Sequence, residues 1–178
     1  MNITVFLGAN MGEDQMYVFE AKSLGKWIGE NGHKLVYGGS KIGLMGVLAD
    51  AVLEHKGQVI GVEPTFFLEQ KMQHDRLTEL IETETIEERR AKMIELGDAF
   101  IAFPGGTGTL EEISEIMSKI VLGHLHAPCI IYNLNGYYDD LRRLLDRMVE
   151  TELASEELLK GIRFAGSLRE MTEIIEGT

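Results

Sequence analysis

Three glycines and two glutamates lie close together between Phe103 and Glu112, in the sequence Phe-Pro-Gly-Gly-Thr-Gly-Thr-Leu-Glu-Glu. The apolar run 99–103 enters this segment and the amphipathic run 110–122 leaves it, which predicts a strand, a glycine-rich turn and a helix. Glycine lets the backbone approach a ligand closely, and a helix start presents free N–H groups and a positive dipole end. The segment therefore predicts an anion site, most often for phosphate.

Several side chains around this turn are candidates for contacts with the bound anion and its neighbours. Thr107 and Thr109 can add hydroxyl donors to the backbone N–H groups of the turn. Glu112 lies far enough into the helix to face the ligand, whereas we expect Glu111 to face away. The alternative is an ordinary strand-to-helix turn, with Glu112 as a solvent-facing carboxylate at a helix start.

Two more glycine-bearing turns follow predicted strands nearer the amino terminus. One spans 8–12 after the strand 3–7, and the other spans 38–46 after the strand 34–37. Turns at the carboxyl ends of parallel strands share one edge of the sheet, where ligands bind. We therefore expect one site built from all three turns, with these residues of the first two turns in contact with the ligand: Gly8, Asn10, Gly38 and Gly39.

Two common nucleotide-binding motifs do not fit these turns. A dinucleotide fingerprint needs three spaced glycines after the first strand and an acidic residue after the second, where this chain has Gly38-Gly39. A nucleoside-triphosphate loop needs a lysine, which Gly108-Thr109-Leu110 lacks. A monophosphate site without an obligatory metal is the remaining interpretation, and His74, His124 and His126 lack the spacing of metal ligands.

The order of the predicted elements indicates an α/β fold. Strands and helices alternate along the chain, which predicts a Rossmann-like, doubly wound parallel sheet flanked by helices. No linker or repeat interrupts the pattern, so we expect a single domain over residues 1–178. The segment 63–75 shows no clear pattern.

The predicted strands span 3–7, 34–37, 59–62, 80–83, 98–103, 128–132 and 162–164. The predicted helices span 17–30, the stretch after 46 up to about 55, 87–96, 110–122, 137–149, 156–160 and 168–175, and Ser167 caps the last of them.

Composition narrows the range of partners. The formal net charge of −12 opposes broad binding to nucleic acid or to anionic membranes. The single cysteine, Cys129, lies in an apolar run and cannot form an intrachain disulfide, which favours a buried, inert thiol and a cytoplasmic protein. The first residues carry no signal-peptide pattern and no apolar run approaches the length of a membrane span.

Several motifs together resemble the LOG (Lonely Guy) family, whose members are often misannotated as lysine decarboxylases. The segment 104–112 matches the family pattern Pro-Gly-Gly-x-Gly-Thr-x-x-Glu, and 37–46 resembles its second glycine turn. The segment 89–93 resembles its Arg-Lys-x-x-Met helix, with Arg90 in place of the lysine. The spacing from Arg89 to Glu112 is the family spacing. The resemblance covers roughly residues 3–138; a departure is Lys71, where many members carry a glutamate.

The resemblance implies a phosphoribohydrolase that splits a nucleoside 5′-monophosphate into free base and ribose 5-phosphate, without a cofactor and as a homodimer. It implies catalytic roles for Arg89 and Glu112, a phosphate loop from Gly105 to Thr109, and a ligand-proximal position for Ser118. Glu112 could stabilise positive charge on the ribose, hold its hydroxyl groups or help activate water, and Arg89 would assist the leaving base or orient Glu112. Arg90 is expected to pair with phosphate or with an acidic neighbour.

One other function stays open from the sequence, and a second lacks the residues that it requires. A nucleotide carrier or sensor on the same fold needs no hydrolysis, because a fold does not fix a function. A lysine decarboxylase needs a lysine that forms a Schiff base with pyridoxal phosphate and an acidic partner for the ring nitrogen, a constellation we do not find in the sequence.

Overall fold

The computed structural model describes residues 1–68 and 70–177. The strands of the described residues form one parallel sheet in the order β4-β3-β2-β1-β5-β6-β7. The predicted α/β, doubly wound architecture is therefore confirmed. The strands are β1 (Asn2–Phe6), β2 (Lys34–Tyr37), β3 (Gln58–Pro64), β4 (Glu79–Thr83), β5 (Ala99–Ala102), β6 (Cys129–Tyr132) and β7 (Ile162–Ala165).

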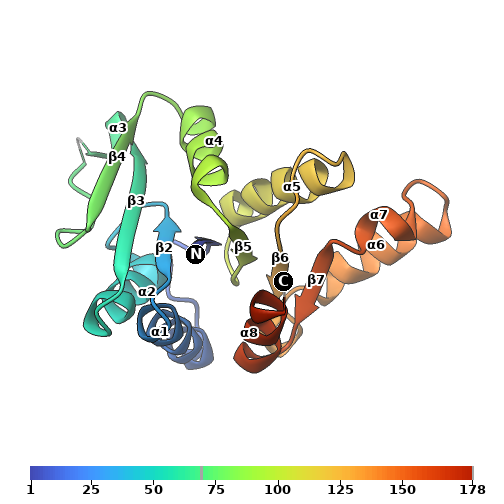
Figure 1. Cartoon of the computed structure of the whole chain (residues 1–178), viewed down its shortest axis with the longest axis horizontal. Helices are drawn as coiled ribbons and strands as arrows, with labels where there is room; N and C mark the ends of the chain where they lie inside the picture. Colours follow the sequence, from blue (N-terminus) through green and yellow to red (C-terminus); the bar gives the residue numbers. More distant parts are fainter. Residues whose placement is uncertain (69, 178) are drawn as a thin grey trace.

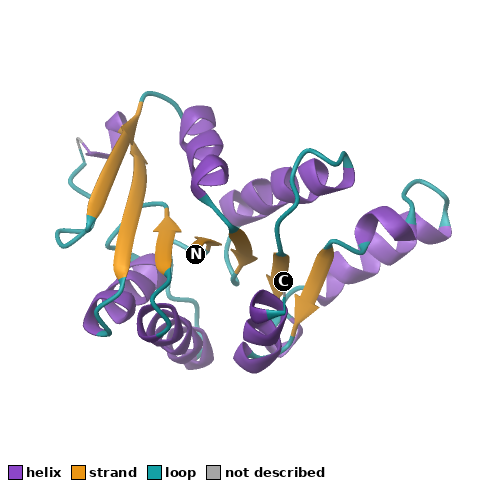
Figure 2. Cartoon of the chain, in the orientation of Figure 1, coloured by secondary structure: helices purple, strands orange, loops and turns teal. Residues whose placement is uncertain are grey.

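Helices cover both faces of the sheet (Figures 1 and 2). The helices α1, α2 and α8 pack on one face, and α4, α5, α6 and α7 lie on the other. Each face has its own apolar core, because side chains alternate between the two faces along a strand. The helices are α1 (Gln15–Glu30), α2 (Gly43–Glu54), α3 (Thr65–Leu68), α4 (Ile86–Leu96), α5 (Thr107–Val121), α6 (Asp139–Glu150), α7 (Glu156–Leu159) and α8 (Leu168–Glu176), with a short 3₁₀ turn at Leu134–Gly136.

The helix starts follow ordinary capping chemistry. The side chain of Asp14 accepts a hydrogen bond from the backbone of Met16 at the start of α1. The hydroxyl of Thr85 accepts one from the backbone of Glu88 and so fixes the start of α4. The predicted cap at Ser167 is confirmed at the start of α8. Such caps satisfy N–H groups that have no partner within the helix.

Among the boundaries that differ from the sequence prediction, two bear on the site. Helix α5 begins at Thr107, inside the glycine motif, and not at Leu110. Apolar periodicity did not reveal this first turn because its residues are polar or glycine. Strand β3 continues through Glu63 and Pro64, beyond the predicted end at Val62, and pairs in register with β4.

The strand order reverses at β1, which has β2 on one side and β5 on the other. Beyond the strand ends, the amide of Phe103 donates to the carbonyl of Phe6 at 2.9 Å, and the amide of Gly8 donates to the carbonyl of Pro104 at 3.3 Å. The turns after β1 and β5 are thus held together at the point where an open α/β sheet binds its ligands. Within the described residues, no helix is both long and apolar enough to cross a bilayer.

Candidate active site

A cavity of about 570 Å³ lies at this edge of the sheet. All three glycine-bearing turns contribute to it, as the sequence predicted. Residues from α4 and α5 close its other side. The predicted site residues that line the cavity are Gly8, Asn10, Gly38, Arg89, Arg90, Gly105, Gly106, Thr107, Gly108, Thr109 and Glu112.

Two predicted site residues lie outside the cavity lining. Ser118 is exposed on α5, about a turn and a half beyond Glu112. Gly39 is adjacent to Gly38, but it packs against the buried side chain of Glu63 rather than the cavity. Within a single chain, therefore, the described structure does not bring Ser118 or Gly39 to the cavity surface.

The start of α5 has the features of an anion site. The first hydrogen bond within the helix runs from the amide of Leu110 to the carbonyl of Gly106 at 3.1 Å, which leaves the preceding amides without a partner inside the helix. A Cβ atom added at Gly106 or at Gly108 would meet nothing within 4 Å. Both positions therefore open onto space that a ligand can fill.

Gly105 plays a different part in the same turn. A Cβ atom at this position would collide with the hydroxyl of Thr109 and lie 2.9 Å from the amide nitrogen of Gly8. Gly105 therefore lets the turns after β1 and β5 touch, and Thr109 is buried against it. The hydroxyl of Tyr137 donates to the carbonyl of Gly105 at 2.5 Å and holds this turn from the side of the cavity.

Arg89 and Glu112 form an ion pair inside the cavity. Nη1 of Arg89 donates to Oε1 of Glu112 at 2.9 Å, and both side chains are largely buried, with 14% and 11% exposure. Nε of Arg89 also donates to the carbonyl of Val62 at 2.9 Å, which ties the guanidinium to the end of β3. The two residues thus lie on the neighbouring helices α4 and α5, with their side chains in direct contact.

The ionisation of Glu112 depends on two opposing effects. Burial raises the pKa of its carboxyl group, because the charged form loses its hydration. The charge of Arg89 and the hydrogen bond from it act in the opposite direction. Burial dominates, so Glu112 is an ionisable group whose proton affinity is higher than that of an exposed glutamate.

Gly38 makes room for Arg89. A Cβ atom at Gly38 would coincide with Nη2 of the arginine and lie 3.2 Å from the sulfur of Met45. The second glycine turn is thus the surface on which the guanidinium rests. The sequence indicated a glycine turn here without showing which side chain required it.

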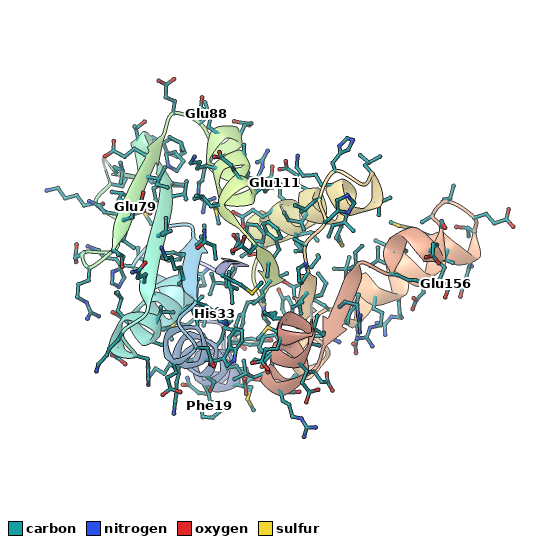
Figure 3. The ribbon with its side chains drawn as sticks, in the orientation of Figure 1. Phe19, His33, Glu79, Glu88, Glu111 and Glu156 are labelled. Carbon is teal, nitrogen blue, oxygen red and sulfur yellow. The ribbon has the colours of Figure 1, made fainter. Side chains whose placement is uncertain are left out.

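Arg90 pairs with acidic neighbours, one of the two alternatives expected for it. Its Nη1 donates to Glu111 at 2.7 Å and its Nε donates to Glu115 at 3.2 Å, which links α4 to α5. Glu111 lies beside α4 at the start of α5 (Figure 3) and lines the rim of the cavity. The expectation that Glu111 faces away from the site is therefore wrong, because Arg90 holds its carboxylate there.

One part of the cavity is apolar and suits a flat base. Its side chains come from α2, α3 and α4, and from the aromatic pair Tyr17 and Tyr137, whose rings meet edge to face with their centroids 6.1 Å apart. Sequence reasoning missed Phe67, Ile86 and both tyrosines, because the segment 63–75 has no periodic pattern and an aromatic residue carries no spacing signal. The apolar lining residues are Leu44, Met45, Phe67, Ile86 and Met93.

The histidines of the chain do not assemble a metal site within the residues that the structure describes. No group of three or more His, Cys, Asp or Glu side chains there could hold an ion. His74 is buried and its Nε2 lies 3.2 Å from Asp50, while its Nδ1 accepts from the backbone of Arg76. These contacts indicate that His74 has a structural role in the loop before β4.

Taken together, the fold and cavity define an α/β protein with a phosphate-type site at a sheet switch point. The family model described as "Possible lysine decarboxylase" matches residues 45–175. A cytokinin riboside 5′-monophosphate phosphoribohydrolase of Rhodococcoides fascians is 44% identical over 79% of this chain and 71% of the relative. A probable enzyme of the same name from Oryza sativa subsp. japonica is 36% identical over 98% of this chain and 70% of the relative. The chain belongs to this family, as the sequence resemblance indicated.

Solved structures confirm the fold at lower identity. The molybdenum cofactor binding protein from Rippkaea orientalis superposes with a TM-score of 0.73 at 24% identity, over 99% of this chain and 95% of that one. The molybdenum cofactor carrier protein from Chlamydomonas reinhardtii gives 0.75 at 18% identity, over the same shares. At these identities the likeness concerns the fold alone.

Proposed function

We propose that this protein hydrolyses the N-glycosidic bond of a nucleoside 5′-monophosphate. Water replaces the base at C1′ of the ribose, which yields the free base and ribose 5-phosphate. The favoured base is adenine or an N6-substituted adenine, as in cytokinin nucleotides. The observation that carries the proposal is the Arg89–Glu112 pair, which lies in one cavity with the open start of α5.

The geometry gives each part of the site a role. The phosphate binds the amides and dipole at the start of α5, beside Gly106 and Gly108. Glu112 then lies where the ribose develops positive charge, which a buried carboxylate stabilises strongly. Arg89 keeps Glu112 ionised and oriented and presents positive charge to the departing base, as an electrostatic aid rather than a proton donor.

The lysine decarboxylase description of the family model does not fit this cavity. That reaction requires a lysine that forms a Schiff base with pyridoxal phosphate. No lysine is found among the described residues that line the cavity. The names of the curated relatives support the phosphoribohydrolase reaction instead.

A nucleotide panel tests the proposal directly. The purified protein is incubated with AMP, N6-substituted AMP, GMP and CMP, and the free base is quantified by chromatography. Release of adenine or its N6-substituted form supports the proposal. Tight nucleotide binding without release of any base would overturn it and favour a carrier.

We further propose a homodimer that works in the cytoplasm. Helix α6 carries Leu141, Leu144, Leu145 and Met148, yet none of them is fully buried within the chain. On α5, Ile113 and Ile116 fill the chain's own core, whereas Leu110 and Leu122 stay exposed. This apolar surface supports self-association. The thiol of Cys129 is fully buried and burial raises its pKa to about 12, which suits a reducing compartment.

A further inference from the structure

One buried carboxyl group next to the site has no role in the proposed reaction. The side chain of Glu63, at the end of β3, is 1% exposed, and its Oε2 has no hydrogen-bond partner. Buried carboxylates are ordinarily paired or hydrogen-bonded, because an isolated buried charge is costly. A buried carboxyl group without such a partner favours its neutral, protonated form, and its burial needs an explanation.

Glu63 packs directly beneath the second glycine turn. Its Cγ and Cδ occupy the space that a side chain at Gly39 would need, and Gly39 adopts a positive φ of 83° that favours glycine. Gly38, the preceding residue, supports the guanidinium of Arg89. The turn is thus enclosed between Glu63 on one side and Arg89 on the other.

A second unpartnered oxygen borders the same turn. Oε1 of Gln73 is buried without a hydrogen-bond partner, and Gln73 pairs through its backbone with Ser40 in an isolated bridge. The amide of His74 donates to the carbonyl of Gly39 at 2.8 Å. Two buried oxygens without a hydrogen-bond partner therefore lie around the turn, and a proton on Glu63 would supply one donor there.

The charged and titratable groups around Glu63 single out one cation. Burial and the charges of Glu63 and of Asp50 on α2 raise the pKa of Tyr37 on β2, and Asp50 is itself engaged by His74 and Arg76. Glu82, the register partner on β4, is exposed. Arg89 of α4 is the cation whose charge acts on Glu63. The same guanidinium already binds Glu112 of α5.

We propose that Glu63 is a positioning residue that leaves Arg89 on Glu112 while it is protonated, and that its ionisation draws Arg89 away from Glu112. The reason is that two carboxylates then compete for one guanidinium in a buried setting, where Coulombic attraction is strong. Glu63 touches neither the substrate nor the reacting atoms, since it lies behind the turn and does not line the cavity. The inference rests on the proposed function, because it assigns Arg89 and Glu112 to the reaction.

The electrostatics agree with this geometry. Burial raises the pKa of Glu63 from its usual value of 4.5 to about 7, with Arg89 opposing part of the rise. Glu63 therefore changes charge near neutral pH. Below that midpoint Glu63 is neutral and does not compete for Arg89. Above it Glu63 carries a negative charge behind Gly39 and competes with Glu112.

The first test compares pH profiles of base release from AMP between pH 5.5 and 9. In the wild type, kcat should fall by about tenfold per pH unit above the midpoint, whereas KM changes little. Glu63→Gln keeps the shape of the residue and cannot ionise, so this basic limb should disappear. Glu82→Gln is the matched control, since it removes an exposed glutamate opposite Glu63, and it should keep the wild-type profile. An unchanged basic limb in Glu63→Gln would overturn the proposal.

The second test needs no catalysis. Carbon-13 NMR of the protein with labelled glutamate follows the carboxyl group of Glu63 during a pH titration, with Glu63→Gln to assign the signal. The midpoint should lie near 7 and fall in Glu112→Gln, because Arg89 is then free to stabilise the charged form of Glu63. A midpoint near that of an exposed glutamate, or one that does not move in Glu112→Gln, contradicts the proposal. A shifting midpoint without any base release would instead sink the proposed reaction and leave the coupling standing.

Discussion

Arg89 holds Glu112 through Nη1 at 2.9 Å while its own Nε is held by the carbonyl of Val62 at 2.9 Å. The arginine therefore connects strand β3 to the helix that carries the candidate catalytic carboxylate. Because both groups are mostly buried, the pair is fixed before any ligand enters. Preorganised charge of this kind acts strongly on a transition state, since no reorganisation is needed during the reaction.

Replacing Glu112 by glutamine should leave the protein folded but nearly inactive. We expect kcat on AMP to fall by about 10²-fold or more, the range seen when one preorganised electrostatic group is lost. Affinity for the nucleotide should change little, because the start of α5 supplies most of the anchoring. Steady-state kinetics and calorimetric binding separate the two effects.

The neighbouring Glu111 is a poor control for this variant because it holds Arg90. Glu95 is better matched: it lies on α4, is exposed, and pairs only with Lys92 among the described residues. Glu95→Gln should keep wild-type turnover. Equal losses in Glu95→Gln and Glu112→Gln would remove the special role of the buried carboxylate.

As pH falls, kcat should begin to decline at a higher pH than it would if the carboxylate had the pKa of an exposed glutamate. Burial raises the pKa of Glu112, and the carboxylate form is the one that stabilises positive charge on the ribose. As pH falls through the raised pKa, Glu112 takes up a proton and kcat drops. The pH profile of kcat measures this limb, and its absence in wild-type protein down to pH 4 would contradict the assignment.

Two adjacent glycines should respond differently to alanine. The methyl group of Gly106→Ala meets no protein atom within 4 Å, so the free energy of unfolding should stay within about 0.5 kcal/mol of the wild type. The KM for AMP should rise, because the methyl group occupies space that the ligand needs. Gly105→Ala collides with Thr109 and crowds the amide of Gly8, so it should destabilise the fold by about 1–3 kcal/mol. Chemical denaturation and kinetics on both variants check the contrast. A rise in KM without loss of stability in both would show that Gly105 does not serve as the contact between turns.

The phosphate should be essential for turnover. AMP should react far faster than adenosine, because the nucleoside leaves the start of α5 unoccupied and its ribose is not held against Glu112. Comparing kcat/KM for the two substrates tests this. Equal values would refute the assignment of the start of α5 as the phosphate anchor.

The stability of the protein should reveal the proton on Glu63. Its pKa is about 7 in the folded state against 4.5 for an exposed glutamate, so the folded state retains a proton that the unfolded state has lost between these values. Wild-type stability therefore falls as pH rises from 4.5 to 7, by about 3 kcal/mol in total at 1.36 kcal/mol per pKa unit. Glu63→Gln should lack this loss, whereas Glu82→Gln should show it. Urea denaturation at pH 5 and pH 8 measures the difference.

The sequence predicted the glycine-rich turns of the site better than the side chains that pack against them. The motif from Pro104 to Glu112 and the spacing of Arg89 led directly to the cavity, because turn chemistry and helix starts have local signatures. The role of Gly38 required the fold, since only the sheet brings α4 over the turn after β2. Glu63 was not predicted at all, because a glutamate in a strand shows its burial only once β2, β3 and α4 are assembled.

Gly38 is also a marker by which relatives of this chain can be sorted. Any side chain there would meet Nη2 of Arg89, which is the movable end of a long side chain, so the guanidinium that binds Glu112 through Nη1 would have to shift. A relative that keeps Arg89 and Glu112 but carries a larger residue at this position would have both members of the proposed catalytic pair, while its arginine could not adopt the position that it has here. Such chains would retain the nucleotide pocket and lose hydrolysis, so a single methyl group would separate binders from enzymes on an otherwise unaltered scaffold.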